Sequence, residues 1–382
     1  MRTEQVSWGE ATGWRRDKKT LSKSDLVLYF GSRETLASGA RYEELQKMFP
    51  VAHVMGCSTG GQISNDDVSD DEIAGVALQF DSTKLKMACE PVDNATSSRA
   101  CGEAIGAKLA ADDLAGIFVL SDGLNVNGSE LVAGIMSKVG RDVSLTGGLA
   151  GDGPNFGKTL VGVDHAPRSH EVAAVGFYGK SIRIGHGSAG GWDVFGPRRR
   201  ITRSAGNVLL ELDREPALDL YERYLGEDEV KGLPGTALLF PLQIHDPLHP
   251  EHEVVRTVLA VDRAARTMTF AGDMPEGWNA QLMRGNFDRL VAGAADAARQ
   301  ARAGIRESAD GDTLAVLVSC IGRRLLMGQR TADEVEAAGA ELGSRMPRLG
   351  FYSYGEISPH AASGVCELHN QTMTVTTIAE AA

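Results

Sequence analysis

The feature that most constrains the fold is a glycine-rich turn that follows a short apolar run and occurs twice at one spacing. The first turn lies within residues 51–63. In the second turn, Gly147 and Gly151 lie about 91 residues after Gly56 and Gly60 of the first. Glycine tolerates positive φ and allows another group to approach the backbone closely. Each turn therefore predicts the end of a buried strand, at a place suited to a ligand.

The segments around the two turns also correspond. Residues 72–78 (EIAGVAL) match residues 171–177 (EVAAVGF) almost residue for residue. A third apolar run, residues 314–320, precedes a further glycine-containing segment at residues 348–359. Repeated order at a fixed offset is typical of repeated supersecondary units. We therefore predict an internal duplication in the N-terminal half, built from two β-α-β-β-β units.

Composition limits the class of protein. The 382 residues are more than one ordinary core holds, which predicts about two domains. The net charge of −12 argues against nucleic acid as a partner, because phosphate binding needs a concentrated basic surface. No apolar stretch reaches the ~18–20 residues that cross a bilayer, so no membrane contact is expected. Five cysteines without metal-type spacing predict reduced thiols and a cytoplasmic location.

We predict a mixed α/β (α+β) fold of two closely packed domains with mixed sheets. The first domain is expected at residues 24–190 and the second at residues 191–378, because the glycine-dense segment 187–197 between them lacks periodicity. Residues 243–252 contain two prolines and are expected to form a loop. The glycine turns should line a pocket that the two domains share.

The candidate ligand contacts lie at the glycine turns and at polar residues of the second domain. They are Gly56, Cys57, Ser58, Thr59, Gly60, Gly147, Gly148, Asp152, Arg323, Glu356 and Asn370. Gly56 and Gly147 are expected to be equivalent positions close to one cavity. Arg323 is expected to be accessible, where it either holds a ligand carboxylate through two hydrogen bonds or caps a strand end.

Two residues raise an enzymatic alternative. Cys57 stands at a strand end, but a nucleophile needs a base within hydrogen-bond reach, and no signature in the sequence supplies one. Asp152 lies between two glycines, where a general base and simple turn chemistry explain it equally well. We expect a protein that is not an enzyme, with a hydrolase or transferase using Cys57 or Asp152 as the alternative.

A group of three histidines raises a second alternative. His245, His249 and His252 lie in the proline-containing segment, and neutral imidazoles are ligands for zinc and haem iron. Pro247 and Pro250 break the helix that would align these side chains on one face, so exposed loop residues are the other interpretation. No firm metal site is predicted from this spacing.

Five short motifs, in this order, resemble those of the FIST family, in which an N-terminal FIST domain precedes a C-terminal one. The motifs are residues 56–63 (GCSTGGQI), 146–153 (TGGLAGDG), 319–324 (SCIGRR), 350–357 (GFYSYGEI) and 368–372 (LHNQT). The sequence departs from the family at Gln62, where members more usually carry glutamate. The resemblance implies a cytoplasmic sensory module for small ligands, amino acids included. Some members of the family are described as haem-binding nitric oxide sensors.

For this chain, the resemblance implies ligand sensing in signal transduction. We expect no output domain after residue 378, and therefore a signalling partner in trans, such as a histidine kinase or a cyclic-di-nucleotide enzyme. No cofactor is expected. The alternative is haem b held by the three histidines, which would make the chain a nitric oxide sensor. A homo-oligomer is compatible with both functions.

Overall fold

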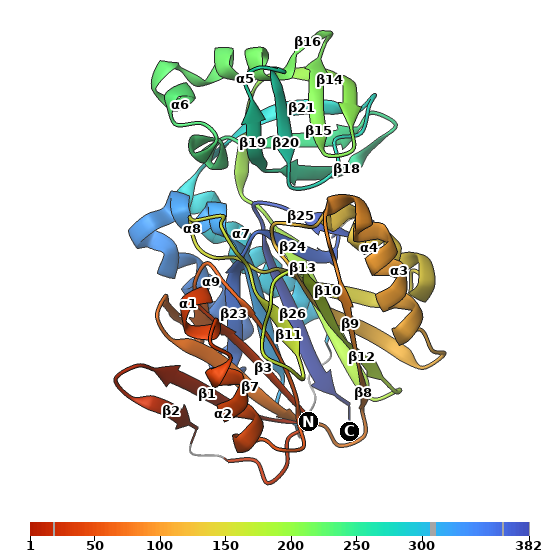
Figure 1. The fold of residues 1–382 in the computed structure, drawn as a ribbon, viewed down its shortest axis with the longest axis vertical. Coiled ribbons are helices and arrows are strands. Elements are labelled where there is room, and N and C mark those ends of the chain that lie inside the picture. The colour runs from red at the N-terminus through yellow and green to blue at the C-terminus, as the bar shows by residue number, and fades with distance from the viewer. Residues whose placement is uncertain (18–19, 306–310, 361–362, 382) are drawn as a thin grey trace.

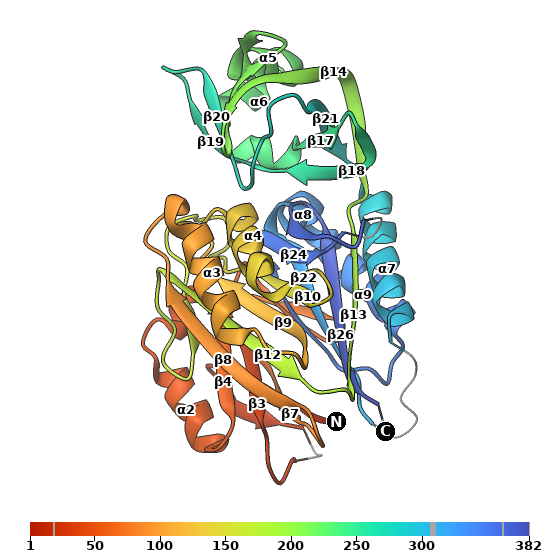
Figure 2. The ribbon, with the colours of Figure 1, turned by 90° about the vertical axis from the view of Figure 1, so that its right-hand side faces the viewer.

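The computed structural model describes residues 1–17, 20–305, 311–360 and 363–381, and the side chains of residues 250–252 also lie outside this description. The chain forms two bodies, one above the other in the views of Figure 1 and Figure 2. Residues 1–191 and 286–381 make up the large body, and residues 192–285 make up the small domain.

Three six-stranded sheets form the large body. The first sheet contains β1 (Arg2–Gly9), β2 (Gly13–Arg16), β3 (Leu26–Gly31), β4 (His53–Ser58), β7 (Ile73–Gln79) and β11 (Val161–Val163). The second contains β8 (Lys84–Pro91), β9 (Leu114–Ser121), β10 (Ser144–Leu149), β12 (Glu171–Tyr178), β24 (Gly355–Pro359) and β25 (Cys366–His369). The third contains β5 (Gln62–Ser64), β6 (Asp67–Ser69), β13 (Ile182–Ala189), β22 (Leu314–Cys320), β23 (Arg348–Ser353) and β26 (Met373–Glu380).

Each sheet is built around one buried strand, β3, β9 or β22. Continuous apolar runs suit these strands because both faces of the sheet are covered. A parallel strand lies on one side of each (β4, β10 or β23), and an antiparallel strand on the other (β7, β12 or β26). The three units thus share one strand order. This likeness does not show the internal duplication inferred from the sequence, which stays a prediction.

After each glycine-containing turn the chain passes into a neighbouring sheet. β5 follows β4 but pairs with β23, β11 follows β10 but pairs with β4, and β24 follows β23 but pairs with β10. The strands expected to complete each repeat locally therefore lie in another sheet. Each sheet needs strands from the other units, so the three sheets are interlocked.

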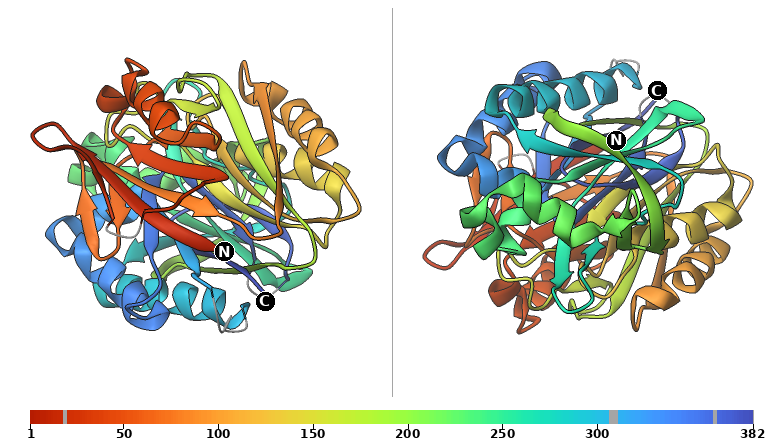
Figure 3. Two further views of the ribbon diagram at one scale, coloured as in Figure 1. Left: turned by 90° about the horizontal axis from the view of Figure 1, so that it is seen from below. Right: turned by 90° about the horizontal axis from the view of Figure 1, so that it is seen from above.

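Helices cover the outside of the large body, in groups that Figure 3 shows around its periphery. They are α1 (Arg33–Leu36), α2 (Ala40–Met48), α3 (Ser98–Leu109), α4 (Gly128–Val139), α7 (Phe287–Ala303), α8 (Ile321–Met327) and α9 (Thr331–Leu342), with short 3₁₀ turns η1 (Ala95–Ser97) and η3 (Gly328–Arg330). α3 packs against α4, and α7 packs against α9. Within the described ranges, no helix is both long and apolar enough to cross a membrane.

The small domain has its own sheet and its own core. Its strands are β14 (Trp192–Ala205), β15 (Val208–Leu212), β16 (Glu215–Pro216), β17 (Leu242–Asp246), β18 (His249–Arg256), β19 (Val258–Asp262), β20 (Thr267–Phe270) and β21 (Asn279–Gly285), and its helices are α5 (Ala217–Leu225), α6 (Glu227–Lys231) and the 3₁₀ turn η2 (Gly235–Leu239). Ile201, Tyr221, Ile244 and Phe270 are among the buried residues of this core.

The loop expected at residues 243–252 is instead a β-hairpin formed by β17 and β18. Proline is tolerated here because β18 is an edge strand and the pairing is irregular between His245 and Asp246, where Asp246 pairs with His249. The two prolines therefore mark a turn and an edge strand, and the prediction of a loop at residues 243–252 was wrong.

The two bodies are not two consecutive halves of the chain. Strands from the last third of the chain pair with strands from the first half, and only residues 192–285 stand apart. The small domain is thus an insertion whose two connections lie side by side. At the first connection, a Cβ on Gly191 would come 2.2 Å from the carbonyl oxygen of Arg289, close to the start of α7.

Candidate functional site

The predicted glycine residues of β4 and β10 are used for strand packing. A Cβ on Gly56 would come 2.4 Å from the carbonyl oxygen of Tyr29, and one on Gly147 would come 1.9 Å from that of Val119. Tyr29 and Val119 are the residues paired with these glycines on β3 and β9. The two glycines therefore occupy matching register positions, but each faces a neighbouring strand at close range and does not open onto a ligand cavity. Gly148 of β10 is buried in the same way, against Val318 of β22.

The turns that follow these strands bind one another. The amide of Gly60 donates to the carbonyl oxygen of Tyr352 (2.8 Å), and the amide of Gly151 donates to that of Ser58 (2.9 Å). Tyr354 donates in turn to Leu149 (3.2 Å). The three strand ends thus meet, as their likeness in sequence suggested. Their backbone donors are largely used to hold the sheets together.

Side chains in the first turn are also engaged within the protein. The Ser58 hydroxyl accepts from the amide of Leu160 (2.9 Å), and Thr59 Oγ1 lies 2.7 Å from the side-chain amide of Gln62. Gly60 lines a cavity of about 430 Å³ beside Arg324. The guanidinium of Arg324 is already paired, because its Nη2 donates to Asp70 (2.8 Å).

Asp152 holds the loop that follows it. Its Oδ2 accepts from the amides of Gly157 (3.0 Å) and Lys158 (2.9 Å), and its Oδ1 accepts from the hydroxyl of Tyr354. Cys57 is fully buried in the first sheet, and burial raises the pKa of its thiol well above the usual value. A nucleophilic cysteine needs the opposite shift. Neither position lends geometric support to the enzymatic alternative.

The expectation that Arg323 is accessible was wrong. Its side chain is 0% exposed, and its Nε (2.9 Å) and Nη2 (2.7 Å) both donate to Oε2 of Glu334 in α9. The remaining donors reach the carbonyl oxygens of Gly190 (2.6 Å) and Leu290 (2.8 Å). Arg323 therefore ties together the two connections to the small domain.

Glu356 and Asn370 lie in buried polar surroundings where the two bodies meet. Burial raises the pKa of Glu356 to about 8, and its carboxyl oxygens accept from the hydroxyls of Ser353 (2.6 Å) and Thr372 (2.9 Å). Asn370 Oδ1 accepts from the amide of Thr257 in the small domain (3.4 Å). In the described part of the chain, Asn370 Nδ2 has no hydrogen-bond partner.

A cavity of about 620 Å³ lies at the junction of the two bodies, and sequence reasoning missed it. Its lining comes from α4, from the end of β18 and the segment after β20, and from the segment around β25. The lining residues are Ser129, Val132, Ala133, Met136, Arg141, Arg256, Asp273, Pro275, Trp278, Ser363, Gly364, Val365, Cys366 and Glu367. Pockets of this size between domains, with an apolar wall and a few charged groups, are typical of small-molecule sites.

Arg256 is the distinctive residue of this cavity. It ends β18 and is only 5% exposed, and its Nε donates to the carbonyl oxygen of Asp273 (3.1 Å) while its Nη1 donates to that of Leu368 (3.0 Å). Among the described residues, no carboxylate forms an ion pair with it, since the Asp273 side chain accepts from Asn127 instead (2.7 Å). Burial lowers the pKa of Arg256, while the nearby carboxylates of Glu367 and Asp273 act in the opposite direction. Within the described ranges the guanidinium forms no direct ion pair with a carboxylate, so it can still bind an anionic ligand.

One signal in the sequence pointed to Arg256. It follows Val254 and Val255 directly, so an arginine ends an apolar strand. The same local pattern describes Arg323, which follows β22 and Ile321. Sequence alone does not separate an arginine that has a buried carboxylate partner from one that has none.

The histidine group offers little to a haem. His245 of β17 is buried, its Nε2 lies 3.2 Å from the side-chain nitrogen of Asn279, and burial lowers its pKa. His249 is exposed, and the side chain of His252 lies outside the described residues. The apolar cavity near Tyr221 has a volume of only about 20 Å³. Haem b stays a hypothesis that rests on the family resemblance.

The fold and the cavity define a two-body α/β protein with a cavity that carries groups of both charge signs at the junction of the bodies. The chain belongs to the FIST family, a family of sensory and signalling domains, because the FIST N domain matches residues 25–215 and the FIST C domain matches residues 217–359. It is also similar to a protein of Methanocaldococcus jannaschii described as uncharacterized protein MJ1623, with 26% identity over 224 residues. That alignment covers 54% of this chain and 41% of the relative, which is less than half of the relative's length.

Proposed function

We propose that this chain senses a small molecule that carries a carboxylate, bound at Arg256 in the junction cavity. The observation that carries the proposal is the buried guanidinium of Arg256, which contacts main-chain carbonyls but has no carboxylate partner within the described ranges. A ligand carboxylate would pair with the guanidinium directly through charge-assisted hydrogen bonds.

An amino acid is the ligand class that the lining favours. Arg256 and Arg141 supply positive charge, while Asp273 and Glu367 supply negative charge in the same cavity. Trp278 adds an aromatic wall on which a side chain can pack. A zwitterion with an apolar side chain matches this combination of both charge signs and an apolar face.

The proposed signal is a change in the position of the small domain. The cavity takes Arg256 and Trp278 from the small domain, and Ser129 and Cys366 from the large body, so a bound ligand contacts both. A ligand shifts a conformational equilibrium only by its difference in affinity for the two states. The two adjoining connections at residues 190–191 and 286–290 are where hinge rotation would occur.

The remaining parts of the function follow from the family alone. The proposed cytoplasmic sensor acts on a partner in trans, such as a histidine kinase or a cyclic-di-nucleotide enzyme, and it carries out no catalysis. A homo-oligomer stays compatible with this scheme.

The test is ligand binding by the parent protein and by a matched pair of arginine variants. Native mass spectrometry of the purified protein would reveal a co-purifying molecule, and a panel of L-amino acids and short dicarboxylates would be screened by thermal shift and calorimetry. A ligand at 100 times its Kd should stabilise the parent by about 2.7 kcal/mol. Arg256→Met should abolish this effect, and Arg256→Lys should retain part of it.

The control is Arg263→Met, which removes an exposed arginine of the same domain that pairs with Glu222 (2.7 Å). This variant should bind as the parent does. Calorimetry well below each variant's Tm separates lost binding from lost stability. Undiminished binding of the identified ligand by Arg256→Met would show that the site lies elsewhere.

A further inference from the structure

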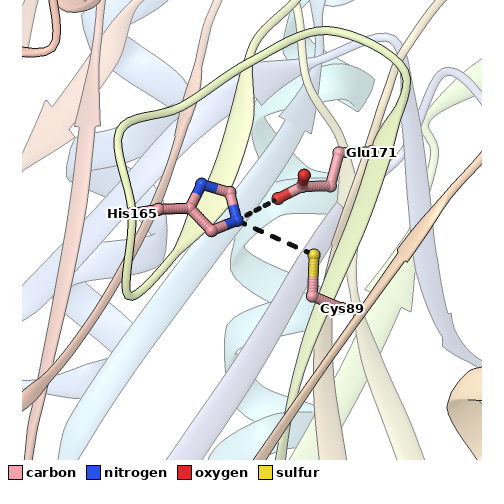
Figure 4. Close-up of side chains that lie close together, drawn as sticks. All are labelled: Cys89, His165 and Glu171. Carbon is pink, nitrogen blue, oxygen red and sulfur yellow. Dashed lines mark hydrogen bonds and ion pairs between the residues drawn. The ribbon is translucent and has the colours of Figure 1, made fainter.

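Three potential metal ligands meet beside the second sheet, and none of them lines the junction cavity. Cys89 comes from β8, Glu171 begins β12, and His165 comes from the loop before β12. Figure 4 shows their side chains converging. His165 Nε2 lies 3.0 Å from Glu171 Oε1 and 3.9 Å from Cys89 Sγ, and all three ligand atoms lie within 4.8 Å of one another.

We propose that Cys89, His165 and Glu171 bind one Zn²⁺ ion and leave a fourth coordination position open to water. Zinc bonds of about 2.3 Å to sulfur and about 2.0–2.2 Å to nitrogen and oxygen place tetrahedral ligand atoms roughly 3.3–3.7 Å apart. The observed separations of 3.0 Å and 3.9 Å fall just either side of this range. Small side-chain rotations are enough to close the coordination sphere.

The position of the imidazole protons favours a metal over a catalytic relay. His165 Nδ1 lies 3.0 Å from the carbonyl oxygen of Ala166, which can only accept, so Nδ1 carries the proton. Nε2 faces both Cys89 and Glu171, and loss of any proton from this nitrogen on metal binding would present its lone pair to an ion that the two side chains share. A nucleophile–histidine–acid relay needs its two partners on different ring nitrogens. One nitrogen facing both partners is the arrangement of ligands around a common ion, with a backbone carbonyl fixing the tautomer.

Hydrogen bonds and ion pairs with surrounding residues already orient the three proposed metal ligands. Glu171 is 1% exposed, and its Oε2 accepts from Arg168 while its Oε1 is directed towards His165. The loop that carries His165 is held by Asp164, whose side chain accepts from the amide of Val54 (3.0 Å) and contacts the imidazole of His53 (2.7 Å). Such fixed second contacts are typical of metal sites in proteins.

The ligand set also selects the class of ion. Thiolate and imidazole suit zinc and disfavour Mg²⁺ and Ca²⁺, which prefer oxygen ligands. On binding, Cys89 gives its thiol proton to solvent, and Zn²⁺ is then coordinated by one thiolate and by one carboxylate that also pairs with Arg168. Cys89 is half-buried and the His165 side chain is 36% exposed, so an ion and a water molecule can reach the site.

The experiment titrates the chelator-treated full-length chain with Zn²⁺ in competition with a chromophoric chelator. The parent should bind one equivalent. Cys89→Ser, His165→Ala and Glu171→Gln should each weaken binding at least as much as the loss of an outer contact, which costs about 10–100-fold. Cys101→Ser, which replaces a buried thiol of α3 outside the cluster, should bind Zn²⁺ as the parent does.

Cobalt substitution tests the ligand type directly. Co²⁺ bound to the parent should show a thiolate charge-transfer band that is absent in Cys89→Ser and unchanged in Cys101→Ser. Circular dichroism checks the fold of each variant, and His165→Ala decides the result if a strand variant does not fold, because His165 lies on a loop. Equal Zn²⁺ affinity in the parent and His165→Ala, or a Co²⁺ spectrum without the thiolate band, would overturn the proposal.

Discussion

Replacing Arg323 by alanine is expected to destabilise the protein strongly, because the substitution leaves a buried carboxylate without its cation. Both residues of the Arg323–Glu334 pair are 0% exposed. Glu334 would keep only the hydroxyls of Ser319 (3.0 Å) and Tyr352 (2.9 Å) as donors. The carbonyl oxygens of Gly190 and Leu290 would lose their contacts with the guanidinium at the same time.

The magnitude follows from the burial of the pair. Removing one partner of a buried ion pair costs about 3–5 kcal/mol, whereas an exposed arginine substitution changes stability by about half a kcal/mol or less. Domains of some 150–250 residues lose at least about 2 °C in Tm for each kcal/mol of lost stability, so a loss of about 3 kcal/mol lowers Tm by about 6 °C. A loss of 3–5 kcal/mol is a large part of the ~5–15 kcal/mol that stabilises a typical protein.

The assay is urea unfolding of the parent, Arg323→Ala and the adjacent control Arg324→Ala. The side chain of Arg324 is 20% exposed and pairs with Asp70, which is 64% exposed, so its loss should cost about 1 kcal/mol or less. The double variant Arg323→Met with Glu334→Leu should recover much of the lost stability, because it removes both buried charges.

The outcome that would refute this reasoning is an Arg323→Ala protein as stable as Arg324→Ala. Such a result would mean that Glu334 takes up a proton or gains water at little cost. It would also restore the interpretation in which Arg323 serves a ligand. A stability loss that the double variant does not recover would assign the effect to the main-chain contacts of Arg323.

Two further predictions concern buried groups of the large body. The folded-state pKa of Glu356 is raised from 4.5 to about 8, so its contribution to stability is complete below pH 4.5 and is lost as the pH rises through 8. The difference in unfolding free energy between the parent and Glu356→Gln should therefore change across this window in urea titrations, and a constant difference would contradict the assignment. Gly147→Ala should destabilise the protein by several kcal/mol, because φ is +138° and the new Cβ would meet Val119. The control Gly153→Ala, whose Cβ would have nothing within 4 Å, should cost about 1 kcal/mol in the same assay. Equal losses of stability in the two variants would contradict the packing argument.

The sequence by itself determined the units of this protein. The apolar runs at β3, β9 and β22 form buried strands, because uninterrupted apolar residues leave no polar face for water. Gly56 and Gly147 fall within β4 and β10, where only glycine fits the close approach of a neighbouring strand. The five ordered motifs predicted the FIST family, which the domain matches confirm.

The tertiary structure decided which unit each strand joins. β5, β11 and β24 each carry a local pattern compatible with pairing in their own unit, and all three pair in a neighbouring sheet. Alternation fixes which face of a strand is buried but does not specify its partner. For the same reason, strands from the last third of the chain complete sheets that begin in its first half.

Packing alone also separated the two buried arginines. Arg323 and Arg256 both follow short apolar runs, yet only Arg323 meets a carboxylate, that of Glu334 on another helix. Glu334 lies 11 residues after Arg323, at no spacing that marks it as a partner. The cost of burying a charge depends on the groups that surround it after folding. The sequence therefore supplied the charged residues, and only the packing of the two bodies decided which of them faces a cavity.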